Sequence, residues 1–274
     1  MSFITRFAPS PTGYLHLGHA FSALTAFDAA RAAGGRLLLR IEDGDRTRCK
    51  PEYEAAILED LAWLGIACET PPRRQSDHIE DYQRPLQSLI ERGLCYRCFR
   101  TRREILISMA HAPHDAEALY FGAPLPAAEE RERIARGEIY AWRLSTARVR
   151  EELGPRALSF EDETGAVRVD PARLGDVVLA RKDFPASYHL ASVWDDARQG
   201  VTHVIRGEDL RESAHVHVTL QALLGLPTPI YRHHRLIVDE HGKRLAKRDA
   251  AKTLRSLRET GASAADIRRM VGLD

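Results

Sequence analysis

The chain has 274 residues, which is more than most domains with a single core, so two lobes or one domain with an insertion are expected. With 44% hydrophobic and 29% charged residues, it can bury a core and remain soluble. The net charge of +1 means that the chain as a whole lacks the basic character that would indicate nucleic-acid binding. Local clusters of arginine are still compatible with this net charge. Four cysteines without an export signal predict reduced thiols.

The first 65 residues predict strands and helices in alternation. Residues 3–7 predict a short strand, and the prolines after it end the pairing. A helix is expected from Gly18 until Gly34-Gly35, followed by a buried parallel strand at 36–41, an apolar run with flanking charges. Pro51 opens a second helix, whose predicted apolar face consists of Ile57, Leu58, Leu61 and Leu64. This order favours a doubly wound α/β core.

The pattern weakens between residues 100 and 175. A charged helix is expected within 123–138 and a hairpin around Gly165, which together indicate an insertion in the core. The core pattern returns at 175–179 and again in a strand that ends at Gly207, and a short helical tail starts near Leu254.

The expected organisation is therefore an α/β chain in four segments. Residues 1–99 form the first half of the core, 100–175 an inserted connective subdomain, and 176–235 the second half of the core. Residues 236–274 form a basic loop and the short helical tail.

The stretch "RFAPSPTGYLHLGHA" at 6–20 places two prolines and two glycines before an apolar run. Residues 7–27 carry no charged side chain, yet their prolines, glycines and histidines exclude a spanning helix, which needs about 20 mostly apolar residues. A charged start and a cleavage site are also missing, so a signal peptide is excluded and a cytosolic chain is expected.

A ligand site is expected just after this turn. In open α/β sheets, ligands bind beyond the carboxyl ends of strands, where a helix N-terminus favours a phosphate. Gly13 and Gly18 allow the backbone to approach a ligand closely. His16 and His19 are three residues apart, so both imidazoles can face the same phosphates. Taken singly, the two histidines would more often be capping or buried residues.

Two motifs resemble the signatures of class I aminoacyl-tRNA synthetases. "APSPTGYLHLGH" resembles the first signature, with His16-Leu17-Gly18-His19 as its core, and the prelude "RFAPSPTG" is typical of the glutamate and glutamine members. "GKRLAKRD" resembles the lysine loop, although Ala246 replaces the serine of many members. Lys247 alone would be interpreted as a solvated lysine. The two motifs together, in this order, indicate the family and its Rossmann-type nucleotide-binding core.

The resemblance implies that ATP activates an amino acid and that pyrophosphate is expelled. His16, His19 and Lys247 would be the catalytic residues: the histidines hold the phosphates and the lysine closes over them. Magnesium would accompany the nucleotide without a dedicated protein cage. The implied ATP-binding residues are His16, Gly18, His19, Arg244, Leu245, Ala246, Lys247 and Arg248.

The resemblance also implies a glutamate pocket. A guanidinium such as that of Arg6 is a natural bidentate partner of a carboxylate, and Glu42 matches the acid that faces the substrate amino group. Singly, Arg6 or Arg206 could form a surface salt bridge, and Tyr188 could be a core aromatic. The implied pocket residues are Arg6, Phe7, Ala8, Pro9, Ser10, Glu42, Tyr188 and Arg206.

Within the family, the chain resembles the truncated glutamyl-Q tRNA(Asp) synthetases. Only 26 residues follow Arg248, too few for an anticodon-binding domain, and Tyr188-His189-Leu190 replaces the Tyr-Asn-Phe of full-length glutamyl-tRNA synthetases. The resemblance implies tRNA-independent activation of L-glutamate and its transfer to queuosine in the anticodon loop of tRNA(Asp), where splayed bases are accessible. It also implies a monomer that binds neither DNA nor a membrane.

Three alternatives remain at this point. The chain could be a catalytic fragment of a glutamyl-tRNA synthetase that charges tRNA(Glu), a regulator without catalytic activity, or another nucleotidyl transferase of the superfamily.

A zinc site found in many members is incomplete in this sequence. The family pattern is Cys-x-Cys followed by Tyr-x3-Cys, whereas Arg100 and Pro124 occupy two of the ligand positions and only Cys98 and Tyr120 remain. Cys95, His111 and His114 lie near enough in sequence to rebuild a site. Because structural zinc normally has four ligands, zinc is not expected as a cofactor and no metal ligand is assigned.

Overall fold

The computed structural model describes residues 2–101, 103–105, 119–173, 175–181, 184–237 and 252–273. Its centre contains two parallel sheets: β1 (Ile4–Phe7), β2 (Arg36–Ile41) and β3 (Glu69–Arg74) form one, and β9 (His203–Gly207) and β10 (Ile230–His234) form the other. The sheets meet where β1 and β9 begin, since Thr202 N donates to Ile4 O at 2.9 Å and Ile4 N to Thr202 Oγ1 at 2.8 Å. The combined order β3-β2-β1-β9-β10 confirms the doubly wound α/β core.

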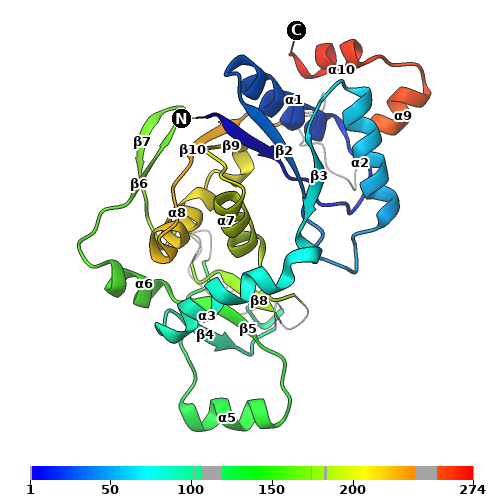
Figure 1. The fold of residues 1–274 in the computed structure, drawn as a ribbon. Helices are drawn as coiled ribbons and strands as arrows, with labels where there is room; N and C mark the ends of the chain where they lie inside the picture. The colour runs from blue at the N-terminus through cyan, green and yellow to red at the C-terminus, as the bar shows by residue number, and fades with distance from the viewer. Residues whose placement is uncertain are drawn as a thin grey trace.

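Helices cover both faces of these strands (Figure 1). On one face lie α1 (Leu17–Ala32), α2 (Pro51–Trp63), α9 (Leu254–Glu259) and α10 (Ala264–Val271). The other face packs against α7 (Tyr188–Arg198) and α8 (Ser213–Leu224). Strand β2 shows why its sequence is apolar throughout: Leu37 and Leu39 enter the first core and Leu38 the opposite one.

The inserted part is built around an antiparallel sheet of β4 (Cys95–Cys98), β5 (Ala141–Leu144) and β8 (Val178–Arg181). Around it lie η1 (Gln75–Tyr82), α3 (Gln83–Glu91) and α6 (Thr146–Leu153), and α5 (Ala127–Ala135) forms the far tip (Figure 1).

The strand expected at 175–179 as a return to the core is therefore β8 of the inserted sheet. The expected boundaries at 100 and 175 cut through this sheet, because β4 precedes the first boundary and β8 follows the second. A short apolar strand has the same sequence pattern in either sheet, so only its pairing partner distinguishes the two.

The expected hairpin is present as β6 (Ser159–Asp162) and β7 (Gly165–Arg168). Gly165 has a φ of 106°, a conformation that favours glycine and closes the turn. The hairpin packs beside β10, where Glu163 accepts a hydrogen bond from His233 N at 3.0 Å. The turn η2 (Glu208–Leu210) follows β9.

The apolar face predicted for α2 is wrong at one position. Ile57, Leu61 and Leu64 are buried, but Leu58 is 37% exposed and Asp60 is fully buried instead. Adjacent helical residues are about 100° apart, so a face that contains 57, 61 and 64 includes 60 before it includes 58.

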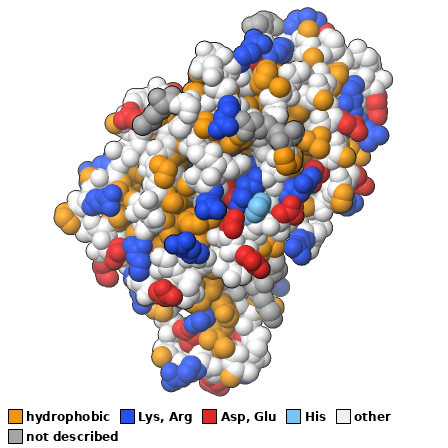
Figure 2. All heavy atoms as spheres, viewed as in Figure 1, with side chains coloured by type: hydrophobic (Ala, Val, Ile, Leu, Met, Phe, Trp, Pro, Cys, Tyr) orange, Lys and Arg blue, Asp and Glu red, His pale blue; other side chains and the backbone are white. Residues whose placement is uncertain are grey.

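All four cysteines are free thiols, as predicted. None of the described helices is long and apolar enough to cross a membrane. Figure 2 shows basic and acidic side chains interspersed over one face of the molecule, in keeping with the net charge of +1.

Candidate active site

A cavity of about 430 Å³ opens between β1 and β9 at their carboxyl ends. The chain order of the strands reverses between these two neighbours, and such a switch point is where open α/β sheets bind ligands. The cavity brings together the described residues that the sequence assigned to the site: Arg6, Phe7, Ala8, Pro9, Ser10, His16, Gly18, His19, Glu42, Tyr188 and Arg206. Arg244, Leu245, Ala246, Lys247 and Arg248 lie outside the described residues.

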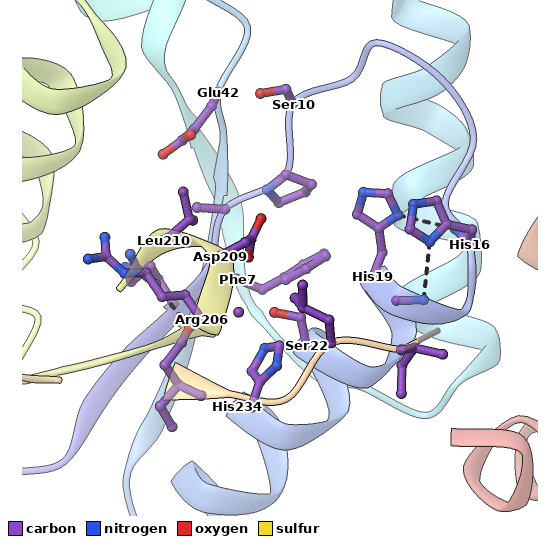
Figure 3. Close-up of a pocket in the computed structure, with 18 of the residues that line it drawn as sticks. Phe7, Ser10, His16, His19, Ser22, Glu42, Arg206, Asp209, Leu210 and His234 are labelled. Atoms are coloured by element: carbon purple, nitrogen blue, oxygen red, sulfur yellow. Dashed lines mark hydrogen bonds between the residues drawn. The ribbon is translucent and has the colours of Figure 1, made fainter. Parts of the chain in front are cut away.

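The cavity has two sides with different chemistry. Figure 3 shows His16 and His19 on one side, at the start of α1, and Arg206 and Glu42 on the other. Asp209 lines the cavity between these groups.

The two histidines cap the N-terminus of α1. His16 Nδ1 accepts from Gly18 N at 3.1 Å, and His19 Nδ1 accepts from His16 N at 3.2 Å. Because each Nδ1 is an acceptor, a neutral ring carries its proton on Nε2. The helix start therefore offers two imidazole donors together with the positive end of its dipole, which favours a polyphosphate.

This capping geometry favours glycine at residue 18. A Cβ at this position would lie 3.0 Å from His16 Cε1 and 3.2 Å from His16 Nδ1. These distances are shorter than an ordinary contact between carbon atoms, so a side chain at residue 18 would displace the imidazole.

A buried cluster of ion pairs lies beneath the side of the cavity that contains Arg206 and Glu42. Asp196 Oδ1 accepts from Arg6 Nε at 3.1 Å and from Arg40 Nη1 at 2.6 Å, while Arg40 Nη2 donates to Glu42 Oε1 at 3.2 Å. Arg6 also donates to the carbonyl oxygen of Ile205 on β9 at 3.3 Å and so links the two sheets where their backbones diverge.

The cluster controls the ionisation of its carboxyl groups. Burial alone would raise the pKa of Asp196, but Arg6 and Arg40 together hold it below its usual value. At Glu42 burial has the larger effect and raises the pKa despite the neighbouring Arg40. Glu42 therefore benefits from a cationic ligand that would stabilise its ionised form.

Arg206 is in a different environment from Arg6 and Arg40. It is only 4% exposed, and its guanidinium donates to His233 Nε2 at 3.3 Å, His217 Nδ1 at 3.2 Å and Tyr188 Oη at 3.4 Å. Within the described residues it has no carboxylate partner, and its Nη2 is buried without a hydrogen bond. Arg206 lines the cavity, and a buried cation without a carboxylate partner favours an anionic ligand.

Several of these residues were missed by sequence reasoning. Arg40 was interpreted as a flanking charge of its strand, but it is fully buried, which is possible because Asp196 and Glu42 neutralise it. An arginine inside an apolar run is a local signal for a buried ion pair, whereas nothing local identifies a partner 156 positions away. His217 and His233 carried no signal in the sequence.

The described residues at the position of the family's zinc site do not complete a set of zinc ligands. Cys98 Sγ and Tyr120 Oη are 3.6 Å apart, and among the described residues they offer two of the four donors that a structural site needs. Cys95 packs in a different core cluster from Cys98, and burial raises the pKa of its thiol to about 12. His111 and His114 lie outside the described residues.

Residues 2–273 match the family described as tRNA synthetases class I (E and Q), catalytic domain. The chain belongs to this family, which uses ATP, and is a ligase. Within the family, it is 51% identical over 286 residues to a glutamyl-Q tRNA(Asp) synthetase of Rhodobacter capsulatus, covering 98% of this chain and 100% of that one. A protein of the same name from Leptothrix cholodnii is 41% identical over 252 residues, 90% of this chain and 82% of that one.

A solved structure supports the same assignment of the fold. The crystal structure of a glutamate tRNA ligase from Elizabethkingia meningosepticum, in complex with its amino acid, superimposes with a TM-score of 0.80 at 29% identity. The match covers 99% of this chain and 60% of that one, so the chain spans about three fifths of the ligase's length.

Proposed function

We propose that the chain activates L-glutamate with Mg–ATP to form glutamyl-adenylate, without requiring tRNA, and transfers the glutamate to queuosine in the anticodon loop of tRNA(Asp). The observation that carries this proposal is the two-sided cavity: Arg206, which has no carboxylate partner in the described part of the chain, lies on one side, and the imidazole donors of His16 and His19 lie on the other. The relatives named glutamyl-Q tRNA(Asp) synthetase support the choice of acceptor, since the chain covers at least 80% of the first three of them.

On the amino-acid side, Arg206 pairs with the side-chain carboxylate of glutamate and Glu42 with its amino group. Burying a charged group without an opposite charge is unfavourable. Both contacts reduce this cost, because the substrate carboxylate pairs with the guanidinium of Arg206 and the substrate ammonium pairs with the carboxylate of Glu42. Arg6 is held by an ion pair with Asp196, which it shares with Arg40, and by the carbonyl oxygen of Ile205, so it acts mainly by holding β1 against β9 and by shaping the pocket.

On the nucleotide side, His16 and His19 donate from Nε2 to the phosphates of ATP. An oxygen of the glutamate α-carboxylate attacks the α-phosphorus, the bond to the bridging oxygen breaks, and pyrophosphate leaves. The protein contributes alignment and charge stabilisation, for which no covalent nucleophile is needed. Lys247 would stabilise the departing pyrophosphate, and magnesium enters with the nucleotide.

Charging of tRNA(Glu) is the second candidate. Proteins named glutamate–tRNA ligase also match, among them one from Methylobacterium at 40% identity, although the chain covers 58% of its length. The two candidates share the activation step and differ in the acceptor. For either candidate we propose a cytoplasmic monomer that acts on RNA, not on DNA.

The acceptor is tested with labelled glutamate, ATP and magnesium, offered with tRNA(Asp) that contains queuosine, with tRNA(Asp) that lacks it, and with tRNA(Glu). Label on the queuosine-containing tRNA alone is the expected result. Label on tRNA(Glu) would establish the second candidate. No transfer to any of the three would leave a regulator as the better interpretation, provided that pyrophosphate exchange also failed.

A further inference from the structure

Three histidines surround the guanidinium of Arg206, and we call them the histidine group: His189 on α7, His217 on α8 and His233 on β10. His217 and His233 contact Arg206 directly, and His189 Nδ1 lies 3.2 Å from His217 Nε2. His217 and His233 are 2% and 6% exposed.

The hydrogen bonds assign one tautomer to each ring. A guanidinium only donates, so His217 Nδ1 and His233 Nε2 must both be acceptors. A neutral His217 then carries its proton on Nε2 and donates it to His189 Nδ1, while a neutral His233 carries its proton on Nδ1. A second proton on His217 or His233 would set an N–H against the N–H of Arg206.

The surroundings keep these rings neutral. Burial and, after it, the charge of Arg206 hold the pKa of His217 well below its usual range. The same two causes lower the pKa of His189 to about 4, and burial with Arg206 and Arg211 lowers that of His233 to about 4. The contacts of Arg206 are thus hydrogen bonds to neutral acceptors, unlike the carboxylate contacts of Arg6 and Arg40.

We propose that His217 and His233 are positioning residues that fix the guanidinium of Arg206 without neutralising it, so that the pocket selects an amino acid with an anionic side chain. A carboxylate at either place would fix Arg206 equally well but would take over the role of the ligand. A neutral amide such as glutamine would leave the buried charge unpaired and is therefore disfavoured. This inference rests on the proposed function, because it concerns the selection of glutamate at the same site.

The test compares His217→Gln with His217→Glu in glutamate-dependent exchange of pyrophosphate into ATP. Glutamine supplies a neutral acceptor, so this conservative variant is expected to stay within about threefold of the wild-type KM for glutamate. Glutamate at residue 217 pairs with Arg206, so the KM for the substrate is expected to rise about 30-fold or more while the KM for ATP stays unchanged. The preference for glutamate over glutamine should fall in parallel.

His215→Glu is the matched control, since His215 lies on the same helix but its ring accepts from Asp170 N, whereas that of His217 contacts Arg206. It introduces the same charge and is expected to leave both KM values unchanged. Equal losses in His217→Gln and His217→Glu would reduce His217 to a packing residue and overturn the proposal. Wild-type protein without glutamate-dependent exchange would instead refute the proposed function itself.

A measurement on the unaltered protein covers the case in which His217→Glu does not fold. Nitrogen-15 NMR of the imidazole rings at pH 6–7 is expected to show neutral rings, with the proton on Nε2 of His217 and on Nδ1 of His233. A charged ring, or the opposite tautomer at either residue, would refute the proposal.

Discussion

Replacing Gly18 by alanine should separate the stability of the fold from the placement of the His16 imidazole, which we propose binds the phosphates of ATP. The new Cβ would lie 3.0 Å from His16 Cε1, which is at least half an ångström closer than an ordinary carbon contact, so the ring must move. A movement of a few tenths of an ångström lengthens the 3.1 Å bond from Gly18 N and weakens the cap. Loss of a cap costs about 0.5–2 kcal/mol.

The intrinsic preference of alanine for helix over glycine offsets this loss by about 1 kcal/mol. The free energy of unfolding should therefore change by no more than about 1 kcal/mol. The loss of catalytic activity has no such compensation: a misplacement of about 1 Å costs on the order of 10²-fold in rate, so a shift of a few tenths of an ångström should cost a smaller, measurable factor. We expect pyrophosphate exchange to fall by about threefold to tenfold.

Thermal unfolding and pyrophosphate exchange, measured on the same preparation, test this expectation. His16→Asn is the matched control: asparagine is a good N-cap but lacks the imidazole donor, so it should retain stability and lose at least as much activity. Wild-type exchange by Gly18→Ala would refute the reasoning, because the position of the His16 ring would then not matter to the reaction.

Three further predictions concern the rest of the chain. Arg6→Ala should raise the KM for glutamate far more than that for ATP in the exchange assay, and equal weakening of both would remove Arg6 from the amino-acid pocket. Lys247→Ala should slow exchange by several orders of magnitude with an unchanged unfolding temperature; undiminished exchange would exclude its role. Burial raises the pKa of Asp60 from 3.8 to about 6, against the effect of Arg258 at 3.6 Å, so the native state binds a proton that the unfolded state does not. The stability of the wild-type protein should therefore fall as pH rises from about 4 through 6. At pH 8 the Asp60→Asn variant should be more stable than the wild type by about 2–3 kcal/mol. Urea titrations of both proteins at several pH values measure this difference. Parallel pH profiles of the two proteins would contradict this assignment.

The local elements of the fold and the turn that carries the site could be predicted from the sequence. The strand at 36–41, the helix that ends before Gly34-Gly35 and the hairpin at Gly165 all follow from contacts or conformations close in the chain. The same holds for His16 and His19, because a helix N-terminus after a stiff turn is a local feature.

The tertiary structure decided the properties that depend on distant partners. Asp196 forms ion pairs with Arg40 and Arg6 from a helix more than 150 positions away, and β8 joins the inserted sheet because of its pairing with β5. Periodicity reports which face of an element is buried, but not which residue it meets there. The sequence by itself thus determined which side chains could bind glutamate and ATP. Only the folded chain placed Arg206 beside His217 and His233, with no carboxylate partner among the described residues.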